Sequence, residues 1–171
     1  MVQPLFLLMA PKRNIPLNLE CLLIFSMNTP LHPTLVHFPI AFLYGALILH
    51  AIQLWRPYWI CRVIGLWLLG MAAFFGIFAS IAGEKDLAHA GQVGYSSEII
   101  ELMNRHELMG NIVVWGSIIF FIAWITLFFK NMRDIRIDKL AFAFLLLLVA
   151  VVSFSAYLGG QLVWVHGVGT P

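Results

Sequence analysis

Four stretches of about twenty apolar residues dominate this chain, at residues 36–55, 63–82, 108–129 and 140–158. A helix rises about 1.5 Å per residue, so each stretch is long enough to cross the roughly 30 Å hydrocarbon core of a bilayer. Backbone polar groups in lipid must bond to one another, and a helix achieves this within one segment. The pattern therefore predicts an all-α integral membrane protein, a four-helix bundle formed by residues 31–171.

Composition supports this class. The 171 residues are 61% hydrophobic and 11% charged, with a mean hydropathy of +0.92. A soluble domain is roughly 45–50% apolar and about 25% charged. The lipid bilayer is the expected environment, and no basic run suggests a nucleic-acid partner. Cys21 and Cys61 lack the close spacing of a metal site and are expected to be small apolar residues.

The first thirty residues do not fit the four-span scheme. Two apolar runs flank a basic pair, the reverse of a signal peptide, in which the basic residues come first. Three prolines, Pro4, Pro11 and Pro16, interrupt any long helix. Two interpretations are equally open: residues 1–26 are an extended start or loosely attached tail, or they are an interfacial segment.

The polar connections set the expected ends of the spans. Residues 83–105 form the longest connection, beginning with a turn at Gly83–Asp86. A helix is expected to start near Glu98, after Ser96 or Ser97, and to run without a break into the third span. Gly159 and Gly160 are expected to end the fourth helix.

The distribution of charge predicts the orientation. Loops 56–62 and 130–139 lie on one side and carry most of the Lys and Arg residues. The positive-inside rule places that side in the cytoplasm. Both termini are then periplasmic, in the inner membrane of a bacterium.

Five of the six histidines fall on the periplasmic side in this topology. They are His32, His37, His89, His106 and His166, while His50 lies deeper in the first span. Ionisable residues at membrane depth suggest a functional site. Three uses are open: a b-type haem held between helices, a copper, zinc or iron ion, or a structural role in capping helix ends.

Several motifs carry a family resemblance. They are Leu31-His32-Pro33-Thr34-Leu35-Val36-His37-Phe38-Pro39-Ile40, the Gly83–Asp86 turn, His106, and the segment from Gly159 to Gly169. With these motifs the chain, over about residues 29–170, resembles the DUF2231 family of small bacterial four-span membrane proteins. That family is similar in layout to di-haem cytochromes b and can be fused to c-type cytochrome domains. The resemblance implies redox work. Only His50 lies toward the cytoplasm, so at most one bis-histidine haem is expected.

The expected ligands of the haem iron are His37 and His106, each at the start of a span. Gly110 is four residues after His106 and lies on the same helix face one turn deeper, which leaves space beside the helix.

The remaining polar residues near this site are given supporting roles. His32 and His166 are expected further out, where they could bind propionates, a second metal or a redox partner. Arg105 is a candidate cation for a propionate. Tyr157 and Gln161 could donate hydrogen bonds, although anchoring at the interface is the more ordinary role for these last three.

These observations predict a membrane-embedded electron-transfer protein that exchanges electrons with quinol or a periplasmic cytochrome. It is more readily a redox carrier or accessory subunit than a stand-alone catalyst. The alternative is a non-catalytic metal-binding or assembly subunit of a larger respiratory complex, with a copper or zinc ion or none. A transporter is disfavoured, because no charge lies mid-span and no helix looks discontinuous.

Overall fold

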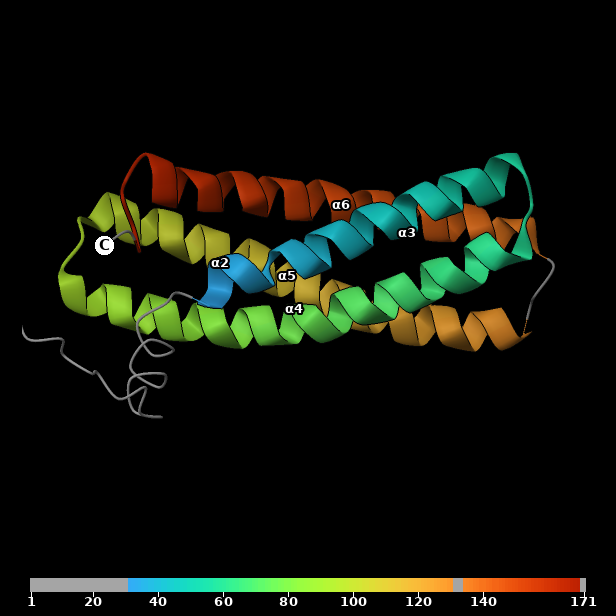
Figure 1. Cartoon of the computed structure of the whole chain (residues 1–171), viewed down its shortest axis with the longest axis horizontal. Helices are drawn as coiled ribbons and strands as arrows, with labels where there is room; N and C mark the ends of the chain where they lie inside the picture. Colours follow the sequence, from blue (N-terminus) through green and yellow to red (C-terminus); the bar gives the residue numbers. More distant parts are fainter. Residues whose placement is uncertain (1–30, 131–133, 170–171) are drawn as a thin grey trace, which may run out of the picture.

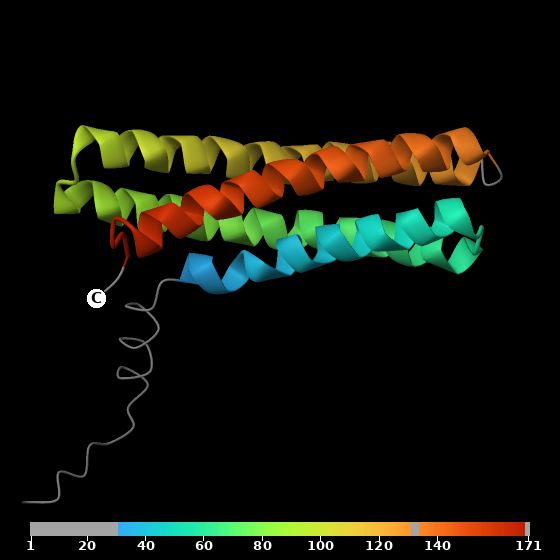
Figure 2. The same cartoon turned by 90° about the horizontal axis from the view of Figure 1, so that it is seen from above.

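The computed structural model describes residues 31–130 and 134–169. The helices are α2 (Leu31–Leu35), α3 (His37–Trp55), α4 (Trp59–Val93), α5 (Ser97–Lys130) and α6 (Ile135–Trp164). The four long helices lie side by side and run alternately in opposite directions (Figures 1 and 2). The prediction of an all-α membrane bundle is confirmed. Residues 1–30 and the predictions made for them lie outside the described residues.

Each long helix is apolar enough and long enough to cross a membrane, with α2 and α3 together forming the first span. The helices α4 and α5 have 35 and 34 residues, or about 50 Å at 1.5 Å per residue. They exceed the hydrocarbon core of roughly 30 Å. The α4–α5 hairpin therefore extends beyond the other helices at one end of the bundle (Figure 1).

Two sequence-based boundaries are wrong. The expected turn at Gly83–Asp86 is helical, and the chain reverses only at Gly94, where φ is +78°. The expected stop at Gly159 and Gly160 is also helical, because α6 continues to Trp164. A helix-interior glycine costs only about 1 kcal/mol relative to alanine, and packing against a neighbouring helix offsets that amount. The start near Glu98 is confirmed, since α5 begins at Ser97.

A break at Val36 separates α2 from α3. Pro39 has no backbone N–H and cannot bond to the carbonyl of Leu35 four residues earlier. On either side the helical pattern holds, because Val36 N donates to His32 O at 3.1 Å and Ile40 N to Val36 O at 3.4 Å. Val36 itself keeps right-handed helical dihedrals, with φ −64° and ψ −23°, so α2 leads into α3 with the hydrogen bond from Pro39 to Leu35 missing between them.

The four long helices form a square in cross-section. In the part of the chain that the structure describes, α3 packs closely against α4 and α6, and α5 against the same two helices. Among the described residues, the helices on each diagonal meet only through long side chains. The central core joins leucine and small side chains from all four, including Leu43, Ala46, Leu69, Val113 and Leu145. Alanine in this core lets the helix backbones approach closely.

The two ends of the bundle differ in chemistry. The histidine end holds α2, the α4–α5 turn and the end of α6, as Figure 1 shows. The basic end holds the α3–α4 turn and the start of α6. The described basic residues at this second end are Arg56, Arg62, Lys130, Arg136 and Lys139.

Candidate functional site

Two histidines meet at the histidine end. The rings of His32, from α2, and His106, from α5, lie with centroids 5.9 Å apart and planes at 83°. Both side chains are half-buried. The structure thus brings together two of the predicted site residues that are 74 positions apart in the chain.

Each ring is held by a backbone carbonyl of another helix, α4 for His32 and α6 for His106. His32 Nδ1 donates to Ala79 O of α4 at 2.7 Å. His106 Nδ1 donates to Ser155 O of α6 at 2.9 Å, and Ser155 Oγ lies 3.3 Å from the same nitrogen. The two histidines are therefore anchored to opposite sides of the bundle, and all four spans contribute to the site.

A glycine lies four residues after each of these carbonyls. A helical Cβ tilts toward the N-terminus, so residue i+4 normally covers the carbonyl of residue i. Gly83 follows Ala79, and a Cβ there would lie 2.9 Å from His32 Nδ1. Gly159 follows Ser155, and a Cβ there would lie 3.0 Å from His106 Cε1. Because Gly83 and Gly159 have no side chain, the carbonyls of Ala79 and Ser155 remain accessible to the two imidazoles.

These hydrogen bonds determine the tautomer. A carbonyl oxygen only accepts, so the proton of each neutral ring is on Nδ1 and the lone pair is on Nε2. Neither Nε2 has a hydrogen bond among the described residues. Histidines that bind metals commonly use this arrangement, in which one nitrogen donates to a carbonyl and the other ligates.

His37 does not join this pair. Its side chain is exposed at the start of α3, whereas it was expected to face His106. His32 and His37 are five residues apart, which on a helix separates their directions by about 140°. His32 points into the bundle, and His37 consequently points outward.

Three other predicted residues belong to the same end of the bundle. His166 is exposed after the end of α6. Arg105 is exposed and pairs with Glu101 at 2.6 Å along the same helix. A Cβ at Gly110 would meet nothing within 4 Å, which confirms open space one turn below His106. The side chain of His89 lies outside the part that the structure describes.

Tyr157 and Gln161 also bond to each other. Gln161 Nε2 donates to the hydroxyl oxygen of Tyr157 at 2.9 Å on the exposed side of α6. Their hydrogen-bonding groups are thus engaged along the helix.

A second polar cluster, at the basic end, was not expected from the sequence. His50 is 1% exposed, and its Nδ1 donates to Ala46 O at 2.9 Å. Its ring packs edge-on against Trp124, with centroids 4.5 Å apart. One turn nearer the loops, Arg62 Nε donates to Asp138 Oδ1 at 2.7 Å, and Arg62 Nη2 pairs with Asp138 Oδ2.

The sequence contained only a faint signal of this cluster. Arg62 and Asp138 each lie four positions into a helix and had been placed in the loops. An arginine and an aspartate that both begin apolar spans at the same membrane depth are a candidate pair. Their partnership joins α4 to α6 across 76 positions.

The two imidazole rings are close enough to share one metal. With bonds of about 2.0–2.1 Å, two imidazoles on opposite sides of one metal have ring centres roughly 6.4 Å apart, and two at a tetrahedral angle roughly 5.2 Å. The observed separation of 5.9 Å lies between these values. Within residues 31–130 and 134–169, no three His, Cys, Asp or Glu side chains are grouped to hold a metal ion. A haem needs only axial ligands from the protein, because its macrocycle supplies the others.

The fold and the site together define a multi-pass helical membrane protein with a histidine pair near one end of a four-span bundle. The chain belongs to the DUF2231 family of predicted membrane proteins, which matches residues 28–171. No curated protein and no solved structure matches it. The family assignment predicted from the sequence motifs is confirmed.

Proposed function

We propose that this protein is an electron-transfer protein of the bacterial inner membrane that binds one b-type haem between His32 and His106. The observation that carries the proposal is the geometry of these two rings. They come from different helices, lie at the separation expected for a shared metal, and keep Nε2 unprotonated. The expected ligand His37 is replaced by His32 in this proposal.

The chain's own residues would fix the axial ligands. The carbonyls of Ala79 and Ser155 hold the two rings in orientation, and a ligand held through its second nitrogen is also a stronger base. Gly83 and Gly159 keep these carbonyls open. The bound haem would supply one-electron chemistry.

Space for a flat macrocycle must come from the surroundings of the pair. Gly110 and Gly160 both have open space where a Cβ would be. The histidine end lies near the membrane surface, where a carrier could exchange electrons with quinol in the bilayer or with a periplasmic cytochrome. Arg105 is close in sequence to His106, and its pairing with Glu101 would have to yield before it could contact a propionate.

The orientation is proposed from the positive-inside rule, which puts the basic end in the cytoplasm and the histidine end in the periplasm. A C-terminal alkaline phosphatase fusion, active only in the periplasm, should be active, and a C-terminal green fluorescent protein fusion should be dark. The opposite result would reverse the orientation.

The decisive test of haem binding is an optical spectrum of the full chain, purified after expression with haem supplied. We expect a Soret band and sharpened α and β bands on adding dithionite. His32→Ala and His106→Ala should each abolish the bis-histidine spectrum. His37→Ala and His166→Ala are matched controls at the same end of the bundle and should leave it unchanged.

Two outcomes would contradict the proposal. A wild-type protein without a Soret band would exclude the haem and favour the metal-binding or assembly alternative. Elemental analysis for copper, zinc and iron would then distinguish a metal-binding subunit from an assembly subunit without metal. A band lost in His37→Ala but kept in His32→Ala would restore the sequence-based ligand choice against the geometry.

A further inference from the structure

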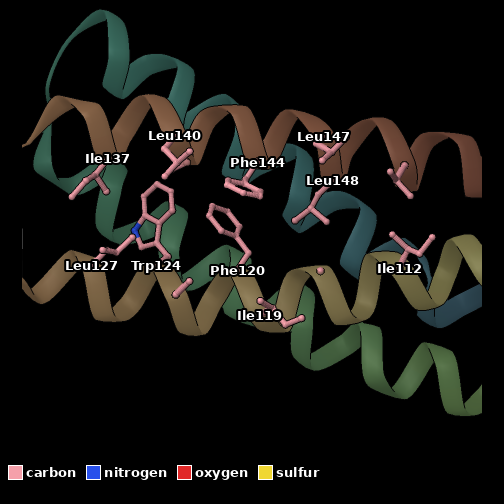
Figure 3. Close-up of a pocket in the computed structure, with 14 residues that line it drawn as sticks. Ile112, Ile119, Phe120, Trp124, Leu127, Ile137, Leu140, Phe144, Leu147 and Leu148 are labelled. Carbon is pink, nitrogen blue, oxygen red and sulfur yellow. The ribbon is translucent and has the colours of Figure 1, made fainter.

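A groove runs between α5 and α6 on the outer face of the bundle. It has a volume of about 510 Å³ and is lined by fourteen residues, all of them apolar or glycine. Phe120 and Trp124 of α5 face Leu140 and Phe144 of α6 across it (Figure 3). The groove is separate from the histidine pair and uses none of its residues.

We propose that this groove holds one acyl chain of an anionic phospholipid, with the phosphate placed between Lys130 and Arg136 at the basic end. The proposal does not depend on haem binding. It rests on the length of the groove, the shape of its walls and the charge at its mouth.

The groove is longer than one membrane leaflet is deep. Along α5 the lining extends from Ile112 to Leu127, or about 22 Å at 1.5 Å per residue. Half of a hydrocarbon core of roughly 30 Å is about 15 Å. The groove therefore covers the full depth of one leaflet and ends close to the polar surface.

The walls suit a flexible chain better than a second helix. Helices pack in membranes through small residues that let their backbones approach. Here the rim is formed by bulky side chains, including Ile119, Phe144 and Leu147. The one glycine in the lining, Gly116, is closed off, since a Cβ there would lie 2.9 Å from Leu148 Cδ2. A thin acyl chain can follow such a narrow channel.

The mouth carries positive charge on both walls. Lys130 is three residues after Leu127, and Arg136 is four residues before Leu140, so both lie on the groove face of their helices. Both side chains are exposed. The carboxylate of Asp134, also at this end, is engaged by the backbone N–H of Arg136 at 2.9 Å. Anionic head groups on the cytoplasmic leaflet are attracted to such basic pairs.

The test compares two lipids that share the same acyl chains, phosphatidylglycerol and phosphatidylcholine. Each is added to the delipidated full chain in detergent, and bound lipid is counted by native mass spectrometry. We expect one tightly retained phosphatidylglycerol per chain. In Lys130→Gln/Arg136→Gln its affinity should fall roughly thirtyfold, toward that of phosphatidylcholine, at about fivefold per basic residue.

Two variants separate the groove from general charge. Lys139→Gln removes a basic residue at the same end but off the groove face, and it should retain the lipid. Ala123→Phe places a ring in the groove and should release both lipids. Equal losses in Lys139→Gln and in the double variant would overturn the proposal. Unchanged lipid retention in Ala123→Phe would also overturn it. A third contrary result would be that the wild-type chain is a dimer and that Ala123→Phe dissociates this dimer while lipid binding stays the same.

Discussion

Replacing Gly65 with alanine should disrupt the polar cluster at the basic end. Gly65 of α4 lies against the ring of His50 of α3. An added Cβ would overlap Cε1 of that ring and lie 2.7 Å from Nδ1. The ring is 1% exposed and packs against Trp124, so it has no free space to move into. The variant must therefore displace the imidazole or separate the two helices.

The size of the effect follows from three contributions. Overpacking of a buried site costs about 1–3 kcal/mol. Displacing His50 from Ala46 O leaves a buried donor without its acceptor, which costs about 1–3 kcal/mol more. The better helix propensity of alanine returns about 1 kcal/mol. We expect Gly65→Ala to lower the free energy of unfolding by about 3 kcal/mol.

The measurement is an unfolding titration with sodium dodecyl sulfate in mixed micelles, followed by circular dichroism. Gly91→Ala, on the same helix, is the matched control, because a Cβ there meets nothing within 4 Å, and it should be neutral or stabilising by up to about 1 kcal/mol. In His50→Ala/Gly65→Ala the clash is gone, so the two losses should be strongly non-additive. Equal stability of Gly65→Ala and wild type, or additive losses in the double variant, would refute this account of the site.

Three further predictions concern interactions between and along the helices. Asp138→Ala should lower the free energy of unfolding by about 3–5 kcal/mol in the same titration, because it removes one partner of a buried ion pair. A double replacement of Asp138 and Arg62 by leucine should recover much of that loss. No recovery would contradict the conclusion that the loss comes from an unpaired buried charge. Glu101→Ala removes an exposed pair within α5 and should change stability by less than about 0.5 kcal/mol, so a large loss would show that the pair is not merely a surface contact. Tyr44→Phe deletes the hydroxyl that bonds to Ser153 Oγ at 2.7 Å between α3 and α6. It should lower the free energy of unfolding by about 0.6 kcal/mol, the average for such hydrogen bonds in membranes. An unchanged midpoint of the unfolding titration would show that this bond does not contribute to stability.

The histidine site illustrates how far sequence patterns reach. The clustering of histidines at one end of the bundle followed from the topology alone. Two of the four histidines proposed for the site, His32 and His106, are in ring contact. The choice of His37 over His32 failed to anticipate the geometry. The choice depends on the direction of each side chain around its helix, and five residues along a helix turn that direction by about 140°.

The glycines show the same limit in another form. Gly83, Gly159 and Gly160 were interpreted as turns and helix ends, which is their common role in soluble proteins. In the structure all three are helical, and Gly83 and Gly159 each lie beneath an imidazole from another helix. A glycine that ends a helix and one that admits a neighbour are alike in sequence, because the difference lies in what packs against it.

The sequence by itself determined the class, the four spans and the chemical difference between the two ends. These properties follow from length and hydropathy, since an apolar segment in lipid can satisfy its backbone only as a helix. Only the tertiary structure decided which side chains are partners: His32 with His106, His50 with Gly65, and Arg62 with Asp138. Those pairings depend on the rotation, register and separation of helices that are far apart in the chain. No local pattern encodes these quantities, because each is settled by the packing of all four helices at once.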